Sequence, residues 1–199
     1  GFHKRHPYVT LNIMEAINFV AENSLEDNSI DLTIYNVHKF PENMDYQILR
    51  KEEIVLVLNK NHPLCKKAQT KEGFLHPWLD LKMLEKENFI LLYPDQNTGG
   101  IAQSLFKEYS MEPTVLLHTR NSAMSIRLAI QGLGAAFAPE SYFREESRFF
   151  PEGCCFSIGA KPVLTTSIAA YQKKKYLSQH ARDYMEILKN YAASLSASK

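Results

Sequence analysis

The pattern of hydrophobic and polar positions is clearest between Pro113 and Pro139. A β-branched and apolar run over Thr114–His118 predicts a short strand. Apolar residues then recur at helical spacing and predict a helix, at Met124, Ile126, Leu128, Ala129 and Ile130. The small apolar residues of 135–138 predict a strand that is buried on both faces and ends at Pro139. The segment is therefore predicted to be a strand–helix–strand unit.

Both ends of this helix carry terminus signals. Asn121 or Ser122 can cap the N-terminus by accepting backbone N–H bonds. Gly132 can take the left-handed conformation that ends a helix, and Gly134 adds a second permissive joint. In open α/β sheets, ligands bind outside the carboxyl ends of strands, where helix N-termini point. The sequence predicts that Asn121 and Ser122 lie at such a place.

The rest of the chain repeats this alternation of strands and helices. Strands are predicted at 8–13, 30–35, 46–49, 53–58, 89–93, 156–158 and 164–171. Helices are predicted at 15–23, 79–84, 101–110 and 184–191, and a charged helix or turn is predicted at 141–148. Alternation of this kind predicts an α/β fold with mixed, mostly parallel sheets flanked by helices. We expect two lobes, 1–58 with 165–199 and 59–164, because the last strand and helix can return to the first group.

Composition narrows the functional classes. The 199 residues are 45% hydrophobic and 23% charged, as in ordinary globular proteins. The net charge is +1, and the Lys and Arg residues are spread along the chain. Nucleic-acid binding draws on concentrated positive charge, so this chain alone is not expected to bind DNA. No apolar stretch approaches the roughly 20 residues that span a bilayer, and no signal peptide opens the chain. We therefore expect no membrane partner.

The cysteines form a sparse and odd-numbered set, Cys65, Cys154 and Cys155. Such usage is typical of a reducing compartment and predicts a cytoplasmic protein. The adjacent pair Cys154–Cys155 is a candidate for a strained disulfide. A redox switch that joins Cys65 with this pair is a second possibility.

The sequence shows no constellation typical of an enzyme. A nucleophile needs a base and an orienting partner within reach. The 7 histidines are scattered, and none lies in a nucleophile elbow, a His-x-x-x-His pair or a zinc-spaced cysteine cluster. The loop at 97–100 lacks the lysine of a nucleotide-binding loop. We predict no catalytic residue, no metal and no cofactor.

Several segments match the motifs of one family in order. Residues 2–11 match F-x-x-x-x-P-x-V-x-L, and 30–34 are similar to a strand of the form [IL]-D-[LV]-[AG]-[IV]. Residues 53–64 look like E-x-L-V-L-V-x-x-x-x-H-P-L, 79–90 are similar to an L-x-D-L step, and 129–139 are similar to V-x-A-G-x-G-I-A-L-L-P. Together they resemble the effector-binding domain of LysR-type transcriptional regulators.

This resemblance implies a two-lobe fold of the type II periplasmic-binding-protein kind, used inside the cell. The lobes would close on a small effector, and the movement would pass to an N-terminal winged helix-turn-helix that this chain does not contain. The match begins late, so we expect the first strand of lobe I and most of its first helix to be missing. The family assembles as homodimers or homotetramers and would contact DNA only through the missing domain.

Three loops are expected to face the cleft between the lobes. They contribute Tyr35 and Asn36, then Asn97, Thr98, Gly99 and Gly100, and finally Arg120, Asn121 and Ser122. Helix N-termini favour anions, and Arg120 can pair with a carboxylate through two bonds. The predicted effector is a small anionic metabolite. The alternative interpretation makes these residues ordinary caps, turns and surface side chains.

Two other functions fit the same fold. A solute-binding protein of a transport system shares the architecture, so the fold does not separate it from a regulator, and the missing signal peptide argues against it. An enzyme such as a dehydratase would need an acid or base in the cleft, and no convincing residue is found. The identity of the effector and whether it activates or represses stay open.

Overall fold

The computed structural model describes residues 1–16, 18–173 and 176–197 and divides into two compact units. The first unit contains Gly1–Lys51 and Thr166–Lys199, and the second contains Glu52–Thr165. The chain passes between them inside β2 (Met44–Asn59) and inside β7 (Leu164–Gln172). The first boundary between the two units lies after Lys51, whereas the sequence analysis expected it after Leu58. The polar residues around Lys51 break the apolar pattern, but the backbone continues through them as one strand.

The first unit is built on an antiparallel pair of strands. β1 (Thr33–Val37) pairs with β7 from Thr33 opposite Ala170 to Val37 opposite Thr166. Helix α2 (Asn18–Glu26) contributes Leu25, which is 1% exposed, to the core between helix and strands. The predicted helix at 15–23 therefore forms, shifted toward the C-terminus.

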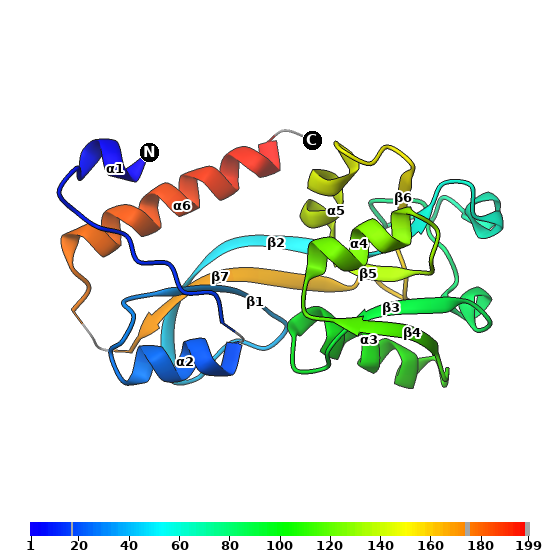
Figure 1. Ribbon diagram of the computed structural model, residues 1–199, viewed down its shortest axis with the longest axis horizontal. Helices are drawn as coiled ribbons and strands as arrows, with labels where there is room; N and C mark the ends of the chain where they lie inside the picture. Colours follow the sequence, from blue (N-terminus) through cyan, green and yellow to red (C-terminus); the bar gives the residue numbers. More distant parts are fainter. Residues whose placement is uncertain (17, 174–175, 198–199) are drawn as a thin grey trace. The chain divides into compact units, whose positions relative to one another are not determined.

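The two ends of the chain meet in the same unit. Helix α1 (Phe2–Arg5) lies beside the long α6 (Gln179–Ala197), as Figure 1 shows. The ring of Phe2 meets that of Tyr184 edge-on at 5.3 Å, and the His6 Nε2 lies 3.0 Å from an Asp183 carboxylate oxygen. The closing helix is therefore held by residues from the first few positions.

The strand predicted at 8–13 does not form. Residues 6–16 contain neither helix nor strand, and Tyr8 is 99% exposed. A strand needs a neighbour to pair its backbone groups, and no described strand lies against this segment. The alternating pattern alone does not supply that partner, so the prediction of a strand was wrong here.

The second unit contains mixed strand pairing. β2 pairs antiparallel with β5 (Ala136–Pro139) and with β6 (Gly153–Phe156). β3 (Asn88–Leu92) and β4 (Thr114–Thr119) are parallel, and a parallel bridge links Phe89 to Ala135. Among the described ladders, β1–β7, β2–β5 and β2–β6 are antiparallel. The sheets are mixed as predicted, with more antiparallel pairing than the alternation of elements suggested.

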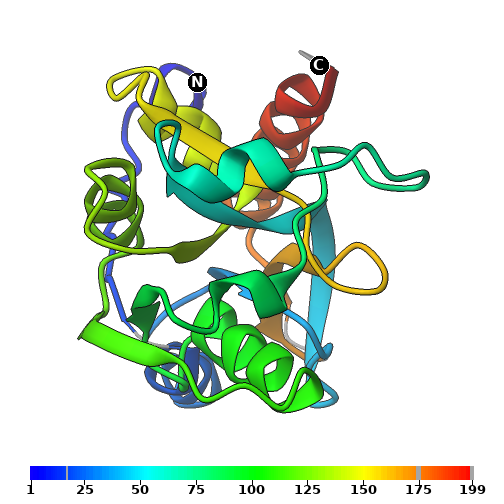
Figure 2. The ribbon, with the colours of Figure 1, turned by 90° about the vertical axis from the view of Figure 1, so that its right-hand side faces the viewer.

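Helices cover both faces of the strands in the second unit. α3 (Asn97–Glu108) packs with Phe89 and Leu91, while α4 (Ser122–Ile130) packs with the intervening Ile90. Figures 1 and 2 show α3 below β3 and β4 and α4 above them. Alternate residues of a strand point to opposite faces, so one short apolar strand serves two cores.

The remaining elements of this unit are short. They are the 3-10 helices η1 (Pro63–Lys67) and η2 (Leu81–Leu84) and the helix α5 (Glu140–Ser147). Asp80 caps η2 through a bond from the Lys82 N–H at 3.0 Å. The helix predicted at 79–84 is therefore a single tight turn. Helix α5 begins directly after Pro139, one residue before the charged helix or turn predicted at 141–148.

Candidate functional site

Two helix N-termini lie at one edge of the second unit. β3 leads into α3 and the parallel neighbour β4 leads into α4, so both strand-to-helix loops lie at the carboxyl edge of the strand pair. The loops touch, because the Gln96 amide donates to the Arg120 carbonyl at 3.0 Å. We call residues 93–100 and 119–125 the α3–α4 edge. It brings together seven of the nine predicted ligand residues, Asn97, Thr98, Gly99, Gly100, Arg120, Asn121 and Ser122.

The α4 terminus has the cap that the sequence predicted. The Asn121 side chain accepts a bond from the Met124 N–H at 2.9 Å. The Asn121 N–H in turn donates to the Thr119 hydroxyl at 3.1 Å. Ser122 is the first helical residue, and its carbonyl accepts from the Ser125 hydroxyl at 2.9 Å. Because Asn121 is exposed, its capping role does not prevent contact with a ligand.

The α3 terminus is built differently. The helix begins at Asn97 and not at Ile101, and the preceding Gln96 side chain does not cap it. The Asn97 amide donates to the Thr165 hydroxyl at 2.8 Å, and Thr165 is 1% exposed. Thr98 is itself 6% exposed. The first turn of α3 is therefore tied to the neighbouring β7 by a buried polar contact.

Gly99 and Gly100, in this turn, differ in how much space a side chain would have. A Cβ on Gly99 would lie 2.1 Å from the Tyr93 carbonyl oxygen, so no side chain fits there. A Cβ on Gly100 would lie 3.2 Å from the Pro94 carbonyl oxygen, which is tight but not closed. Gly99 is therefore required by the packing of the helix against the end of β3, independently of any ligand.

The two glycines after α4 are needed for different reasons. Gly132 has φ +85°, which confirms the predicted left-handed end of the helix. Gly134 is required by close approach, because a Cβ there would lie 2.5 Å from the Asn88 carbonyl oxygen.

Arg120 already has an acidic partner. Its Nη1 lies 2.9 Å from an Asp95 carboxylate oxygen, and its guanidinium lies 4.7 Å over the Tyr93 ring. The side chains of Arg120 and Asp95 are 50% and 46% exposed, so water screens the pair. Arg120 would have to exchange Asp95 for a ligand carboxylate to act as predicted.

Tyr35 and Asn36 belong to the first unit. They are neighbours on β1 and point to opposite faces of the strand. Tyr35 lines a cavity of about 200 Å³ with Glu22, Glu26 and Lys39. Burial raises the pKa of the Tyr35 phenol, and the nearby Glu22 raises it further. The two side chains therefore leave β1 in opposite directions.

Some polar residues in or next to the α3–α4 edge were not identified from the sequence. Asp95 and Gln96 directly precede a predicted loop residue, and their polar character next to a helix start was the available signal. Thr165 gave no signal, because it is 68 positions from Asn97.

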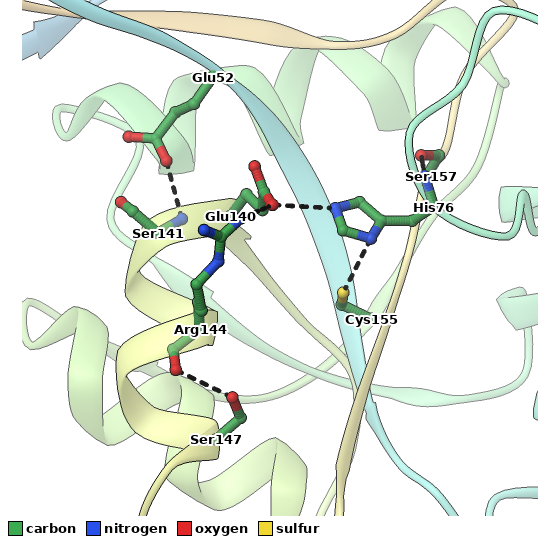
Figure 3. A network of polar contacts seen from close by, with 8 residues as sticks. All are labelled: Glu52, His76, Glu140, Ser141, Arg144, Ser147, Cys155 and Ser157. Carbon is green, nitrogen blue, oxygen red and sulfur yellow. Dashed lines mark hydrogen bonds and ion pairs between the residues drawn. The ribbon is translucent and has the colours of Figure 1, made fainter. Parts of the chain in front are cut away.

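A second, partly buried polar cluster surrounds the start of α5 (Figure 3). The Nδ1 atom of His76 lies 3.7 Å from the Cys155 sulfur, and its Nε2 lies 3.5 Å from a Glu140 carboxylate oxygen. Arg144 pairs with Glu140, and the Ser141 N–H donates to the Glu52 carboxylate at 2.8 Å. Cysteine, histidine and carboxylate thus form a row that no spacing in the sequence indicated.

The electrostatics of this row oppose nucleophilic chemistry. Burial raises the pKa of Cys155 to about 12, and the charges of Glu140 and Glu53 add to the effect. Glu53 is 4% exposed, and burial also raises its pKa. A cysteine nucleophile acts as the thiolate, which these carboxylates disfavour. The described part of the chain contains no group of three or more His, Cys, Asp or Glu placed to hold a metal.

None of the helices in the described ranges combines the length and the apolar character that a bilayer crossing requires.

A family model for the LysR substrate binding domain matches residues 1–193. The chain belongs to this family. The LysR domain is 30% identical to the HTH-type transcriptional regulator CfxR of Cupriavidus necator, over 67% of this chain and 39% of that protein. It is 23% identical to the Hca operon transcriptional activator HcaR of Escherichia coli, over 98% of this chain and 62% of that protein. The chain therefore spans less than two thirds of these relatives.

Solved structures establish the fold of the LysR domain. The regulatory domain of Synechocystis CcmR in complex with 2-PG matches with a TM-score of 0.79 at 19% identity, covering 96% of this chain and 87% of that one. The effector-binding domain of QuiR in complex with shikimate matches with 0.74 at 19% identity, over 97% and 87%. The BenM effector-binding domain with benzoate matches with 0.72 at 19% identity, over 98% and 84%. The predicted two-lobe α/β fold is confirmed.

Proposed function

We propose that this chain is the effector-binding domain of a LysR-type transcriptional regulator and senses a small anionic metabolite. The family match over residues 1–193 carries the proposal. The relatives described above are transcriptional regulators, and the matching structures are regulatory or effector-binding domains. These findings favour regulation over the solute-binding role in transport that shares the fold.

The α3–α4 edge supports an anionic effector. Helix N-termini present unpaired backbone N–H groups and a partial positive charge, which favour a carboxylate or phosphate. The solved neighbours hold shikimate and benzoate, which are carboxylates, and 2-PG. We assign ligand contacts in the second unit to Asn97, Thr98, Gly99, Gly100, Arg120, Asn121 and Ser122. Tyr35 and Asn36 would contribute from the first unit, and Arg120 would leave Asp95 for the ligand.

Regulation would follow from differential binding. An effector shifts a regulator only when it binds one arrangement better than another. We propose that the arrangements differ in the closure of the two units and in the packing of a homodimer or homotetramer. DNA would be contacted through a domain outside this chain, consistent with its net charge of +1. The protein would act in the cytoplasm, without a cofactor, a membrane partner or a catalytic step.

A thermal-shift screen tests the effector class. The panel contains small carboxylates and phosphate esters, each beside its neutral amide or ester. A ligand at about 100 times its Kd adds roughly 2.7 kcal/mol of stability and raises the melting temperature. We expect an anion to raise it and its neutral counterpart to have no effect. Equal shifts from both members of a pair would contradict the anionic effector.

Matched variants then locate the site with the anion found. Thr98→Val and Ser122→Ala remove hydroxyl groups at the α3–α4 edge, whereas Ser104→Ala removes an exposed hydroxyl farther along α3. We expect calorimetry to show weaker binding in the first two variants and unchanged affinity in the third. Unchanged affinity in all three would contradict the site and leave the family assignment intact.

The proposed assembly is tested by sedimentation of the purified chain. We expect a mass of two or four copies at micromolar concentration. A concentration-independent monomer would contradict assembly through this domain.

A further inference from the structure

Two of the three cysteines lie face to face in the second unit. Cys65 is in η1 and Cys154 is in β6, and their sulfur atoms are 3.3 Å apart. Both are free thiols and partly buried. The positions are 89 residues apart in sequence, so the fold creates this proximity.

The backbone holds both thiols in place. Cys154 pairs with Leu58 in the β2–β6 ladder, and its sulfur lies 3.4 Å from the Leu58 carbonyl oxygen. The Cys65 sulfur lies 3.3 Å from the carbonyl oxygen of the next residue, Asn59. In η1, the His62 ring accepts from the Leu64 N–H at 3.3 Å. Both sulfurs therefore lie against backbone carbonyl groups at the end of β2.

Cys155 points the other way. Successive residues of a strand face opposite sides, and Cys154 and Cys155 accordingly pack against different hydrophobic cores. Cys155 contacts His76 instead. The strained disulfide between adjacent cysteines that the sequence suggested is therefore disfavoured, and Cys155 provides a natural control.

We propose that Cys65 and Cys154 form a redox modification site, at which a peroxide oxidises the two thiols to an intramolecular disulfide. A disulfide bond is about 2.05 Å long, so the sulfurs must approach by roughly 1 Å. Rotation of the two cysteine side chains would supply a movement of this size. The bond would fasten η1 to β6 within the second unit.

The oxidation balances with one peroxide per bond. The Cys65 thiolate attacks one peroxide oxygen, the O–O bond breaks, and the released hydroxide takes a proton to become water. The sulfur of Cys154 then attacks the sulfenic sulfur of Cys65 and loses its proton, and the departing hydroxide becomes a second water. The two thiols lose two electrons and two protons, and the peroxide accepts both electrons.

The order of the two thiols follows from their surroundings. Burial raises the pKa of Cys154, and the hydrogen bond with Cys65 raises it further. Cys154 therefore stays protonated and acts second, as the resolving thiol. Cys65 lies on a short surface helix next to the exposed Lys66 and Lys67, where an oxidant can reach it.

The test uses the reduced full chain with hydrogen peroxide. Thiol titration of the unfolded product should fall from three groups to one, and the intact mass should fall by about 2 Da. A non-reducing peptide map should join Cys65 to Cys154, and dithiothreitol should reverse the change. The oxidised chain should also melt at a higher temperature, because the bond constrains the unfolded chain.

Matched serine variants sharpen the test. Cys155→Ser should form the bond as the natural chain does, whereas Cys65→Ser and Cys154→Ser should form none. A map that joins Cys155 to either partner would overturn the proposal. So would three intact thiols after treatment, or oxidation to separate sulfinic acids without a bond. The map of the natural chain decides the question even when a variant folds poorly.

Discussion

At the scale of single residues, Gly99 gives the sharpest prediction. An alanine Cβ there would lie 2.1 Å from the Tyr93 carbonyl oxygen, so the first turn of α3 must shift. We expect Gly99→Ala to lower the free energy of unfolding by about 3 kcal/mol, as overpacking does. Gly100→Ala is the control, because its Cβ would be 3.2 Å from the nearest atom and alanine favours helix. Equal urea midpoints for the two variants would show that the Tyr93 carbonyl does not lie as close to position 99 as the structure indicates.

Glu53 makes stability depend on pH. Burial, with the charge of Glu140 as a further contribution, raises its pKa above the ordinary 4.5, although Ser157 and His76 oppose the shift. A carboxyl that binds its proton more tightly in the folded chain favours folding at low pH. This contribution is lost as the pH rises from 4.5 through the raised pKa.

The test compares Glu53→Gln with the natural chain. The glutamine never ionises, so the variant should gain stability relative to the natural chain as the pH rises from 4 to 8. Urea unfolding at intervals across this range measures the difference. Glu112→Gln, at an exposed position, provides the matched substitution. A difference for Glu53→Gln that stays constant with pH would argue against a raised pKa.

At the scale of elements, local signals in the sequence were sufficient where one segment determines its own structure. The Asn121 cap and the left-handed Gly132 both follow from residues next to the helix end. Pairing partners decide the rest. The segment at 8–13 has the alternation of a strand but no described partner, whereas β2 is paired with β7 as well as with β5 and β6 and continues through its polar residues.

The candidate site, too, could be predicted only in part from the sequence. Each loop of the α3–α4 edge was found from its own residues, because helix starts are marked locally. The contacts between loops were not, since Thr165 and the row of His76, Glu140 and Cys155 are assembled from distant positions. No spacing rule links residues that meet only after the strands have paired.

The cap at α4 yields a prediction for the element as a whole. Asn121→Ala leaves the Met124 N–H without its acceptor, and we expect a loss of about 1 kcal/mol in the free energy of unfolding. Asn121→Ser keeps an acceptor and should recover most of it. Asp80→Ala removes a cap elsewhere in the same unit and serves as the control for ligand binding. A loss of affinity in Asp80→Ala equal to that in Asn121→Ala would mean that stability, not contact, explains both.

At the scale of the whole molecule, the two units differ in how their residues are distributed along the chain. The second is one continuous segment, whereas the first joins residues from both ends of the chain. Both large hydrophobic cores of the second unit draw all their members from its own residues. A continuous chain with its own core is the usual condition for independent folding. The first unit is not a continuous segment, so it does not meet this condition.

We therefore expect residues 52–165, expressed alone, to fold and to unfold in urea in one cooperative transition followed by circular dichroism. The excised segment then tests where the effector binds. It retains the α3–α4 edge but lacks Tyr35 and Asn36, so an effector held by both units should bind it at least tenfold more weakly than the full chain, a difference of about 1.4 kcal/mol. Equal affinity would confine the site to the second unit and remove closure around the ligand from the mechanism. A noncooperative transition would instead show that the two large cores are insufficient without the rest of β2 and β7.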